Sequence, residues 1–118
     1  MLHSTTVQRT FDAPHRVAGH SVCGESHAHR WTIAVTTSGG LDPKRVLVVD
    51  HGEFQAALDA VVDELRNRDL NDMLPGVITT PEGIALYVHE RLVLDWPKLI
   101  AVAVTMGEVR VSVEVTIR

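Results

Sequence analysis

Apolar and polar residues alternate at both ends of this chain, and this pattern predicts a fold built on a β-sheet. Residues 27–37 keep their large apolar side chains on one parity, as in a strand with one buried face. The last twenty residues alternate in the same way and are interrupted at Gly107, which predicts two further strands. A fourth strand is expected over residues 5–11, ending where Pro14 stops ladder pairing.

In the middle of the chain, the apolar residues recur at helical spacing. Asp50 with Glu53 three residues later indicates a helix start, because an aspartate side chain can cap the free N–H groups of the first turn. Thr80, followed by proline and glutamate, indicates a second start, and Pro97 marks the end of that segment. Residues 66–75, between the two helices, are polar and turn-like. The apolar positions at helical spacing are Phe54, Leu58, Val61 and Leu65, then Ile84, Tyr87, Val88 and Leu92.

The order strand, strand, helix, helix, strand, strand predicts an α+β fold, with both helices on one face of an antiparallel sheet. A chain of 118 residues has room for one domain, which we place at residues 1–118. A small sheet of this kind leaves two edges that need pairing or protection. Joining the sheets of neighbouring subunits would pair these edges, so we expect a homo-oligomer.

The composition excludes several classes of protein. With 45% hydrophobic and 22% charged residues, the chain is expected to be globular. Its net charge is −4 and its basic residues are scattered, so nucleic acid is not an expected partner. We expect no membrane partner and a cytoplasmic location, because no apolar stretch could span a bilayer and the first residues lack a signal-peptide core. Seven histidines are the unusual feature.

His27 and His29 lie two residues apart in a predicted strand, so both rings project from the same face. They share the parity of Trp31, on a face where imidazoles without a partner are costly. His15, just past the end of the first strand, is placed to reach the same end of the sheet. Three histidines leave one open position on a tetrahedral Zn²⁺, as in catalytic sites, and three imidazoles suit iron as well. The alternative is that a chain with seven histidines contains such a pair by chance.

Cys23 is the only cysteine and cannot form a disulfide within the chain. It lies four residues before His27, so its sulfur could approach a substrate on the metal, and a neighbouring cation would favour the thiolate. The alternative is a small buried hydrophobic residue, which is the commoner role of a lone cysteine.

Five segments, in order and across most of the chain, carry a family resemblance. They are FDAPHR (11–16), CGESHAH (23–29), VVDHGEF (48–54), LND (70–72) and TTPEGIALYV (79–88). Together they resemble the 6-pyruvoyl-tetrahydropterin synthase family. The spacing Cys-x3-His-x-His is similar to that of its bacterial 6-carboxytetrahydropterin synthase branch.

The resemblance implies the tunnelling fold, in which ββααββ subunits join their sheets into an oligomeric barrel, a trimer or hexamer, with active sites between subunits. It implies Zn²⁺ on His15, His27 and His29. It also implies that Cys23 is the general base that moves protons on the side chain of dihydroneopterin triphosphate, with the metal holding side-chain oxygens.

The chain departs from the family where a proton relay is expected. The family usually carries an Asp-His pair shortly before the LND segment, and here the aligned residues are Arg66 and Asn67. Neither exchanges protons near neutral pH. His20 and His51 could take over proton transfer, although a solvent-facing or hydrogen-bonded histidine is the simpler interpretation of both.

A second departure concerns the pterin ring. The family holds this ring with a glutamate at the end of the penultimate strand, where this chain has Met106, which cannot accept the ring's hydrogen bonds. Glu108, two residues later on the same parity, could substitute if the strand is shifted. Thr79 and Thr80 match threonines that line the family's pterin pocket, and Thr80 is equally suited to cap a helix.

Three functions are compatible with these residues. The first is a zinc-dependent lyase or cyclase resembling 6-carboxytetrahydropterin synthase, whose small-molecule substrate need not be a pterin; enolisation, elimination, retro-aldol cleavage and cyclisation are its candidate reactions. The second is a 6-carboxytetrahydropterin synthase acting on dihydroneopterin triphosphate. The third is a zinc-stabilised binding protein without catalysis. The sequence favours the first, because the histidines are present while the relay and the ring anchor are altered.

Overall fold

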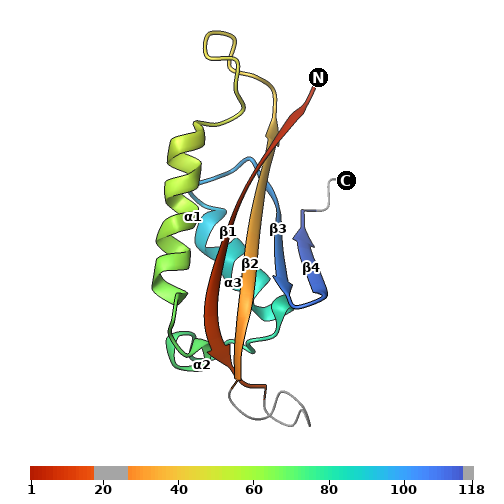
Figure 1. Ribbon diagram of the computed structural model, residues 1–118. Coiled ribbons are helices and arrows are strands. Elements are labelled where there is room, and N and C mark those ends of the chain that lie inside the picture. The colour runs from red at the N-terminus through yellow and green to blue at the C-terminus, as the bar shows by residue number, and fades with distance from the viewer. Residues whose placement is uncertain (18–26, 116–118) are drawn as a thin grey trace.

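The protein is a curved antiparallel sheet covered on one face by helices (Figure 1). The computed structural model describes residues 1–17 and 27–115. Within them the strands pair in the order β1-β2-β3-β4. The elements are β1 (His3–His15), β2 (His27–Gly39), α1 (His51–Leu65), α2 (Leu70–Met73), α3 (Pro81–Leu92), β3 (Leu99–Met106) and β4 (Val109–Glu114). The predicted α+β class and the predicted order of strands and helices along the chain are confirmed, with α2 added between the two longer helices.

β1 is longer than the sequence indicated, because Pro14 does not end it. The strand continues to His15, and its last pairs with β2 are Pro14 with Ala28 and His15 with His27. β1 lies at one edge of the described sheet, where a residue without an N–H can face away from the partner strand. The prediction that His15 lies past the strand was therefore wrong: it is the last residue of β1.

The two longer helices begin where the capping residues predicted. Asp50 accepts a hydrogen bond from the N–H of Glu53 at 2.9 Å and begins α1. Thr80 accepts one from the N–H of Gly83 at 3.1 Å and begins α3, with Pro81 in its first turn. None of the helices in the described ranges is long and apolar enough to cross a membrane.

The segment between them was predicted as a turn, and this was wrong for Leu70–Met73, which forms the short helix α2. Asp69 caps this helix by accepting a hydrogen bond from the N–H of Asn71 at 2.9 Å. Leu70 is fully buried in the main core. A four-residue helix has too few apolar positions to show a period, so only this burial reveals it.

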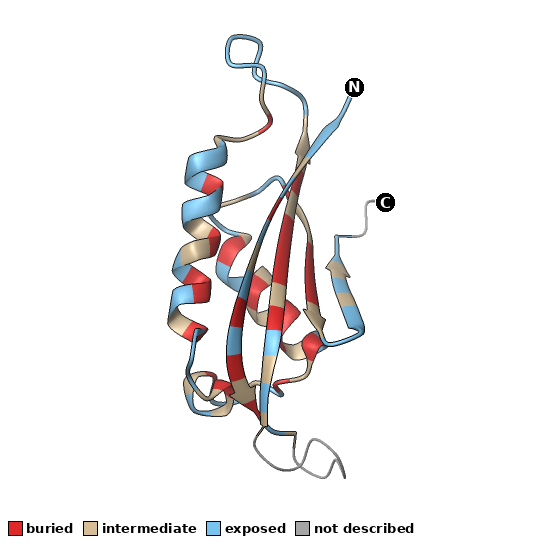
Figure 2. Ribbon diagram, in the orientation of Figure 1, coloured by how far each residue is buried: buried red, intermediate tan, exposed pale blue. Residues whose placement is uncertain are grey.

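The core lies between the helices and one face of the sheet, where Figure 2 shows the buried residues gathered. The opposite face is polar, with hydroxyl pairs across the ladder: Thr6 with Thr36 at 2.7 Å and Thr10 with Thr32 at 3.0 Å. The sheet is therefore half covered, as predicted. The helix-facing core includes Phe11, Trp31, Ile33, Val35, Val102 and Val104 from the strands and Phe54, Leu58, Val61, Ile84, Val88 and Leu92 from the helices.

Candidate metal centre

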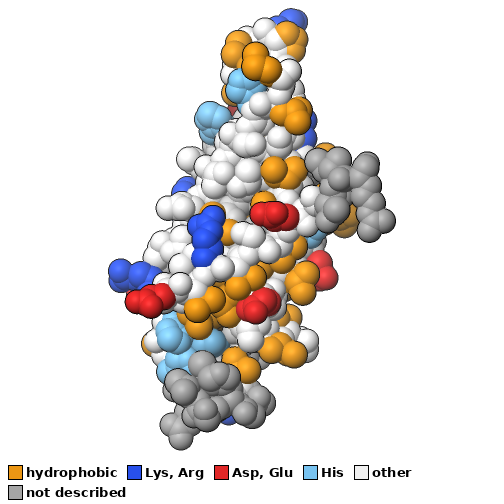
Figure 3. Space-filling view, turned by 90° about the vertical axis from the view of Figure 1, so that its right-hand side faces the viewer, with side chains coloured by type: hydrophobic (Ala, Val, Ile, Leu, Met, Phe, Trp, Pro, Cys, Tyr) orange, Lys and Arg blue, Asp and Glu red, His pale blue; other side chains and the backbone are white. Residues whose placement is uncertain are grey.

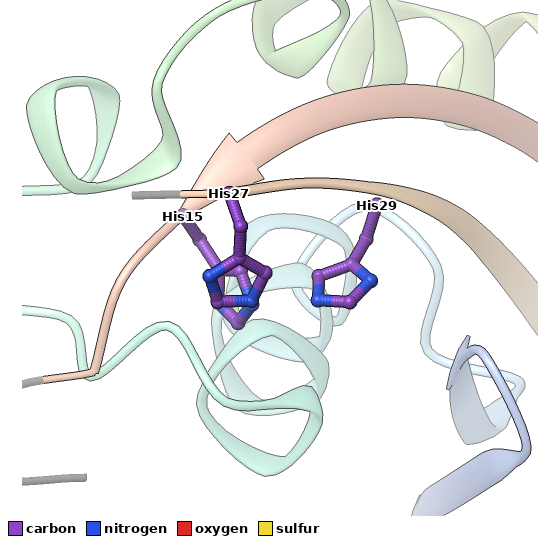
Figure 4. A group of neighbouring side chains, drawn as sticks. All are labelled: His15, His27 and His29. Carbon is purple, nitrogen blue, oxygen red and sulfur yellow. The ribbon is translucent and has the colours of Figure 1, made fainter. Parts of the chain in front are cut away.

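The three histidines predicted as metal ligands lie together at the end of the sheet where β1 finishes and β2 begins (Figure 4). His15 and His27 are directly opposite each other in the ladder, and His29 follows two residues later on the same face. Their ring centroids are 4.4–5.2 Å apart. One nitrogen from each ring lies within 4.8 Å of the others. The three rings can therefore close on a single ion with small side-chain movements.

The hydrogen bonding of His15 fixes which nitrogen faces the cluster. Its Nδ1–H donates to the backbone carbonyl of Thr79 at 2.7 Å, since a carbonyl oxygen can only accept. In the neutral ring, Nε2 then carries the lone pair. This atom is buried and has no hydrogen-bond partner within the described residues, and the same holds for Nε2 of His29. A histidine that binds a metal through one ring nitrogen commonly donates the N–H of its other nitrogen to a carbonyl or carboxylate, as His15 does to Thr79.

Burial favours the neutral form of these two imidazoles. It lowers the pKa of His15 below the ordinary 6.5, although the bond to Thr79 opposes the shift, and the neighbouring His27 lowers it further. Burial likewise lowers the pKa of His29, with a smaller contribution from His27. Neutral imidazole is the form that binds a metal, and a buried nitrogen without a partner is costly. This donor set fits Zn²⁺ or iron.

Trp31 forms the inner wall of the cluster. It is fully buried, its ring centroid lies 4.9 Å from that of His15, and its indole N–H donates to the carbonyl of Ala13 at 3.0 Å. The sequence identified Trp31 only as a core residue. In the structure, its ring packs directly against His15 in the cluster.

A pocket of about 200 Å³ lies beside His15. Its walls are mainly apolar and include Met106, and Glu82 is the one carboxylate among the described residues that line it. Figure 3 shows histidine side chains at the surface near this end of the molecule, with hydrophobic side chains close by. The sequence indicated Glu82 only as a first-turn acid. The full lining is His15, Val17, Thr80, Pro81, Glu82, Met106 and Val109.

The structure places the three residues predicted to bind substrate, and the methionine at the ring-anchor position, in different surroundings. Thr80 lines the pocket while it caps α3, and Met106 lines it too. Thr79 is buried, and its hydroxyl donates to the backbone carbonyl of Arg16 at 3.1 Å. The prediction that Glu108 continues the parity of β3 was wrong, because the chain turns after Met106 and Glu108 is exposed in the β3–β4 turn.

The residues at the relay positions have structural contacts instead. Arg66 ends α1 and its side chain lies 3.7 Å from Asp63. Asn67 adopts a positive φ of 59°, which asparagine tolerates better than most residues, and its N–H donates to the carbonyl of Asp12 at 2.8 Å. His51 is exposed at the start of α1. Cys23 and His20 lie outside the described residues.

Comparison with known proteins identifies the family. Residues 4–116 match the family model described as 6-pyruvoyl tetrahydropterin synthase. The chain belongs to this family. The dihydroneopterin monophosphate aldolase of Pyrococcus furiosus is 33% identical to it over 88 residues, which are 75% of this chain and 73% of the relative.

Solved structures of family members share the fold. The 6-pyruvoyl tetrahydropterin synthase of Caenorhabditis elegans superposes with a TM-score of 0.90 at 18% identity, covering 98% of this chain and 97% of that one. The enzyme from Plasmodium vivax gives 0.76 at 13% identity, covering 99% of both chains. The predicted tunnelling-fold subunit is thereby confirmed, and the chain is related to enzymes of pterin biosynthesis.

Proposed function

We propose that this protein is a metal-dependent lyase that cleaves a carbon–carbon bond in the side chain of a phosphorylated dihydropterin. The observation that carries the proposal is the cluster of His15, His27 and His29 beside an open pocket, in which the buried Nε2 atoms of His15 and His29 have no hydrogen-bond partner within the described residues. The name of the Pyrococcus furiosus relative, dihydroneopterin monophosphate aldolase, supports both the reaction type and the substrate class.

The reaction is a retro-aldol cleavage of the dihydroneopterin side chain. The hydroxyl on the second side-chain carbon loses its proton, and the bond between the first and second carbons breaks. Its electrons move into the C=N bond of the dihydropterin ring, and a proton is then added to the first carbon. The products are a 6-hydroxymethyl-dihydropterin and a phosphorylated glycolaldehyde. A metal ion on the three imidazoles would supply a Lewis acid for the side-chain oxygens.

The pocket residues suit the ring of this substrate. The side chains of Met106, Pro81 and Val109 offer apolar surface for a flat heterocycle. Glu82 supplies a carboxylate that can accept hydrogen bonds from the ring's N–H groups, which Met106 cannot do. We assign the proton transfers to Cys23, as the family resemblance implies.

The altered relay favours cleavage over the synthase reaction. Retro-aldol cleavage removes one proton and returns one, so a single acid–base group can serve both steps. Forming a pyruvoyl or carboxy product requires additional proton transfers along the side chain. Arg66 and Asn67 lie outside the pocket and exchange no protons near neutral pH. Cleavage needs fewer proton-transfer groups than the synthase reaction, so it is the better match to this site.

Turnover by the purified protein, with its zinc and iron content measured, tests this function. With dihydroneopterin monophosphate we expect mass spectrometry to detect 6-hydroxymethyl-dihydropterin. Cys23→Ser should lower kcat by about 10²–10⁴-fold, typical for loss of an acid–base group, at unchanged metal content.

A carboxy-tetrahydropterin made from the triphosphate would instead identify a synthase. Absence of turnover with either substrate at full metal loading would contradict the proposal, and a Cys23→Ser variant as active as the parent would remove Cys23 from the mechanism.

We further propose that the active form is a homo-oligomer, a trimer or hexamer, with sites between subunits. β1 and β4 are the two edges of the described sheet, and Val109 and Val115 at the β4 edge are half exposed. Pairing β4 of one copy with β1 of the next would cover both edges. Light scattering is expected to give three or six times the mass of one chain, and a monomer at micromolar concentration would contradict this assembly.

A further inference from the structure

The side chain of Asn71 holds the backbone directly after a predicted metal ligand. Its Oδ1 accepts a hydrogen bond from the N–H of Arg16 at 2.8 Å, and its Nδ2 donates to the carbonyl of Arg16 at 2.9 Å. Pairing of β1 with β2 ends at His15 and His27. The amide of Asn71 therefore engages both backbone groups of the next residue, as a neighbouring strand would.

Thr79 also binds this end of β1. Its hydroxyl donates to the carbonyl of Arg16 at 3.1 Å and lies 3.3 Å from Oδ1 of Asn71. Its own carbonyl accepts the Nδ1–H of His15. The two consecutive residues His15 and Arg16 are thus joined by four hydrogen bonds to two residues that lie more than 50 positions away in the sequence.

Asn71 is itself held in place. It lies in α2, where the side chain of Asp69 accepts its backbone N–H at 2.9 Å. The preceding residue, Leu70, is fully buried in the core. The position of the Asn71 amide is therefore fixed by the core and by the helix cap, and neither of these contacts involves the three histidines.

We propose that Asn71 is a positioning residue for the metal centre, because it fixes the end of β1 and so directs Nε2 of His15 toward His27 and His29. The inference rests on the proposed metal centre and assigns a role to the LND segment. Asn71 contacts neither the pocket beside His15 nor the other two imidazoles among the contacts of the described residues. It acts through backbone geometry, so its loss should weaken metal binding rather than abolish it.

The test compares Zn²⁺ affinity in Asn71→Ala, the parent and Asp72→Ala, by competition with a chelator below the melting temperature of each metal-free protein. Asp72 is the exposed neighbour in the same short helix and serves as the matched control. Asn71→Ala is expected to raise the Kd about 10–100-fold, typical for a residue that supports a ligand. The visible spectrum of the Co²⁺ form should shift as well, which a purely global loss of stability would not cause. Asp72→Ala should match the parent in both measurements.

The outcomes distinguish failure of the positioning role of Asn71 from failure of the proposed metal centre. Parent-like affinity in Asn71→Ala would overturn the positioning role while leaving the metal centre intact. A parent protein that binds no Zn²⁺ or Co²⁺ would overturn the metal centre and the inference together. If Asn71→Ala does not fold, Asn71→Asp decides, because it keeps an acceptor for the Arg16 N–H and loses the donor to its carbonyl. Its affinity should fall several-fold, and parent-like binding would overturn the role.

Discussion

Gly83→Ala is expected to lower the melting temperature by about 10 °C or more. A β-carbon at Gly83 would overlap the carbonyl oxygen of Ile78 and would lie 2.9 Å from its carbonyl carbon. A backbone carbonyl cannot move aside as a flexible side chain can, so either α3 or the segment before it must shift. Overpacking of this kind costs about 1–3 kcal/mol and sometimes more, and each kcal/mol corresponds to several degrees in a domain of this size.

The same substitution should weaken metal binding. Ile78 immediately precedes Thr79, whose carbonyl orients His15. Moving Ile78 away from Gly83 moves that carbonyl, so Gly83→Ala is expected to show a weaker rise in melting temperature on adding Zn²⁺.

Gly40→Ala is the matched control for this prediction, because nothing lies within 4 Å of a β-carbon built at Gly40. Its stability should stay within about 0.5 kcal/mol of the parent. Thermal unfolding with and without Zn²⁺ measures both effects. Equal melting curves for Gly83→Ala and Gly40→Ala would contradict the tight approach of α3 to Ile78.

Features set by local chemistry were predictable from the sequence. Asp50 and Thr80 begin helices because their side chains reach N–H groups three residues away. His27 and His29 were assigned to one face because side chains alternate along a strand. His15 joined them because neighbouring strands bring their ends together, although its exact place in β1 was missed.

Features set by distant contacts were not predictable. The bonds from Asn71 and Thr79 to residues 15 and 16 span 55 to 64 positions, and no local pattern encodes them. α2 was missed for the same reason, since the burial of Leu70 defines it. The position of Glu108 depended on where β3 turns, which the alternating valines on both sides of Gly107 do not specify.

His29→Ala is expected to remove metal binding while leaving the metal-free fold intact. Two imidazoles remain, fewer than the three protein ligands of a typical catalytic zinc site. The loss in affinity should exceed the 10–100-fold expected for a supporting residue such as Asn71. In the metal-free protein, the substitution removes a buried Nε2 that has no partner within the described residues, so it relieves a cost there.

The two melting temperatures therefore separate a metal ligand from a packing residue. Metal-free His29→Ala should melt at or above the temperature of the metal-free parent, and added Zn²⁺ should raise only the parent. His51→Ala is the matched control, because His51 is exposed at the end of α1 farthest from α2 (Figure 1) and its loss should leave metal content unchanged. Metal content after dialysis is measured in all three proteins. Full metal content in His29→Ala, or an equal fall in melting temperature with and without Zn²⁺, would assign His29 a structural role and leave the proposed lyase without its Lewis acid.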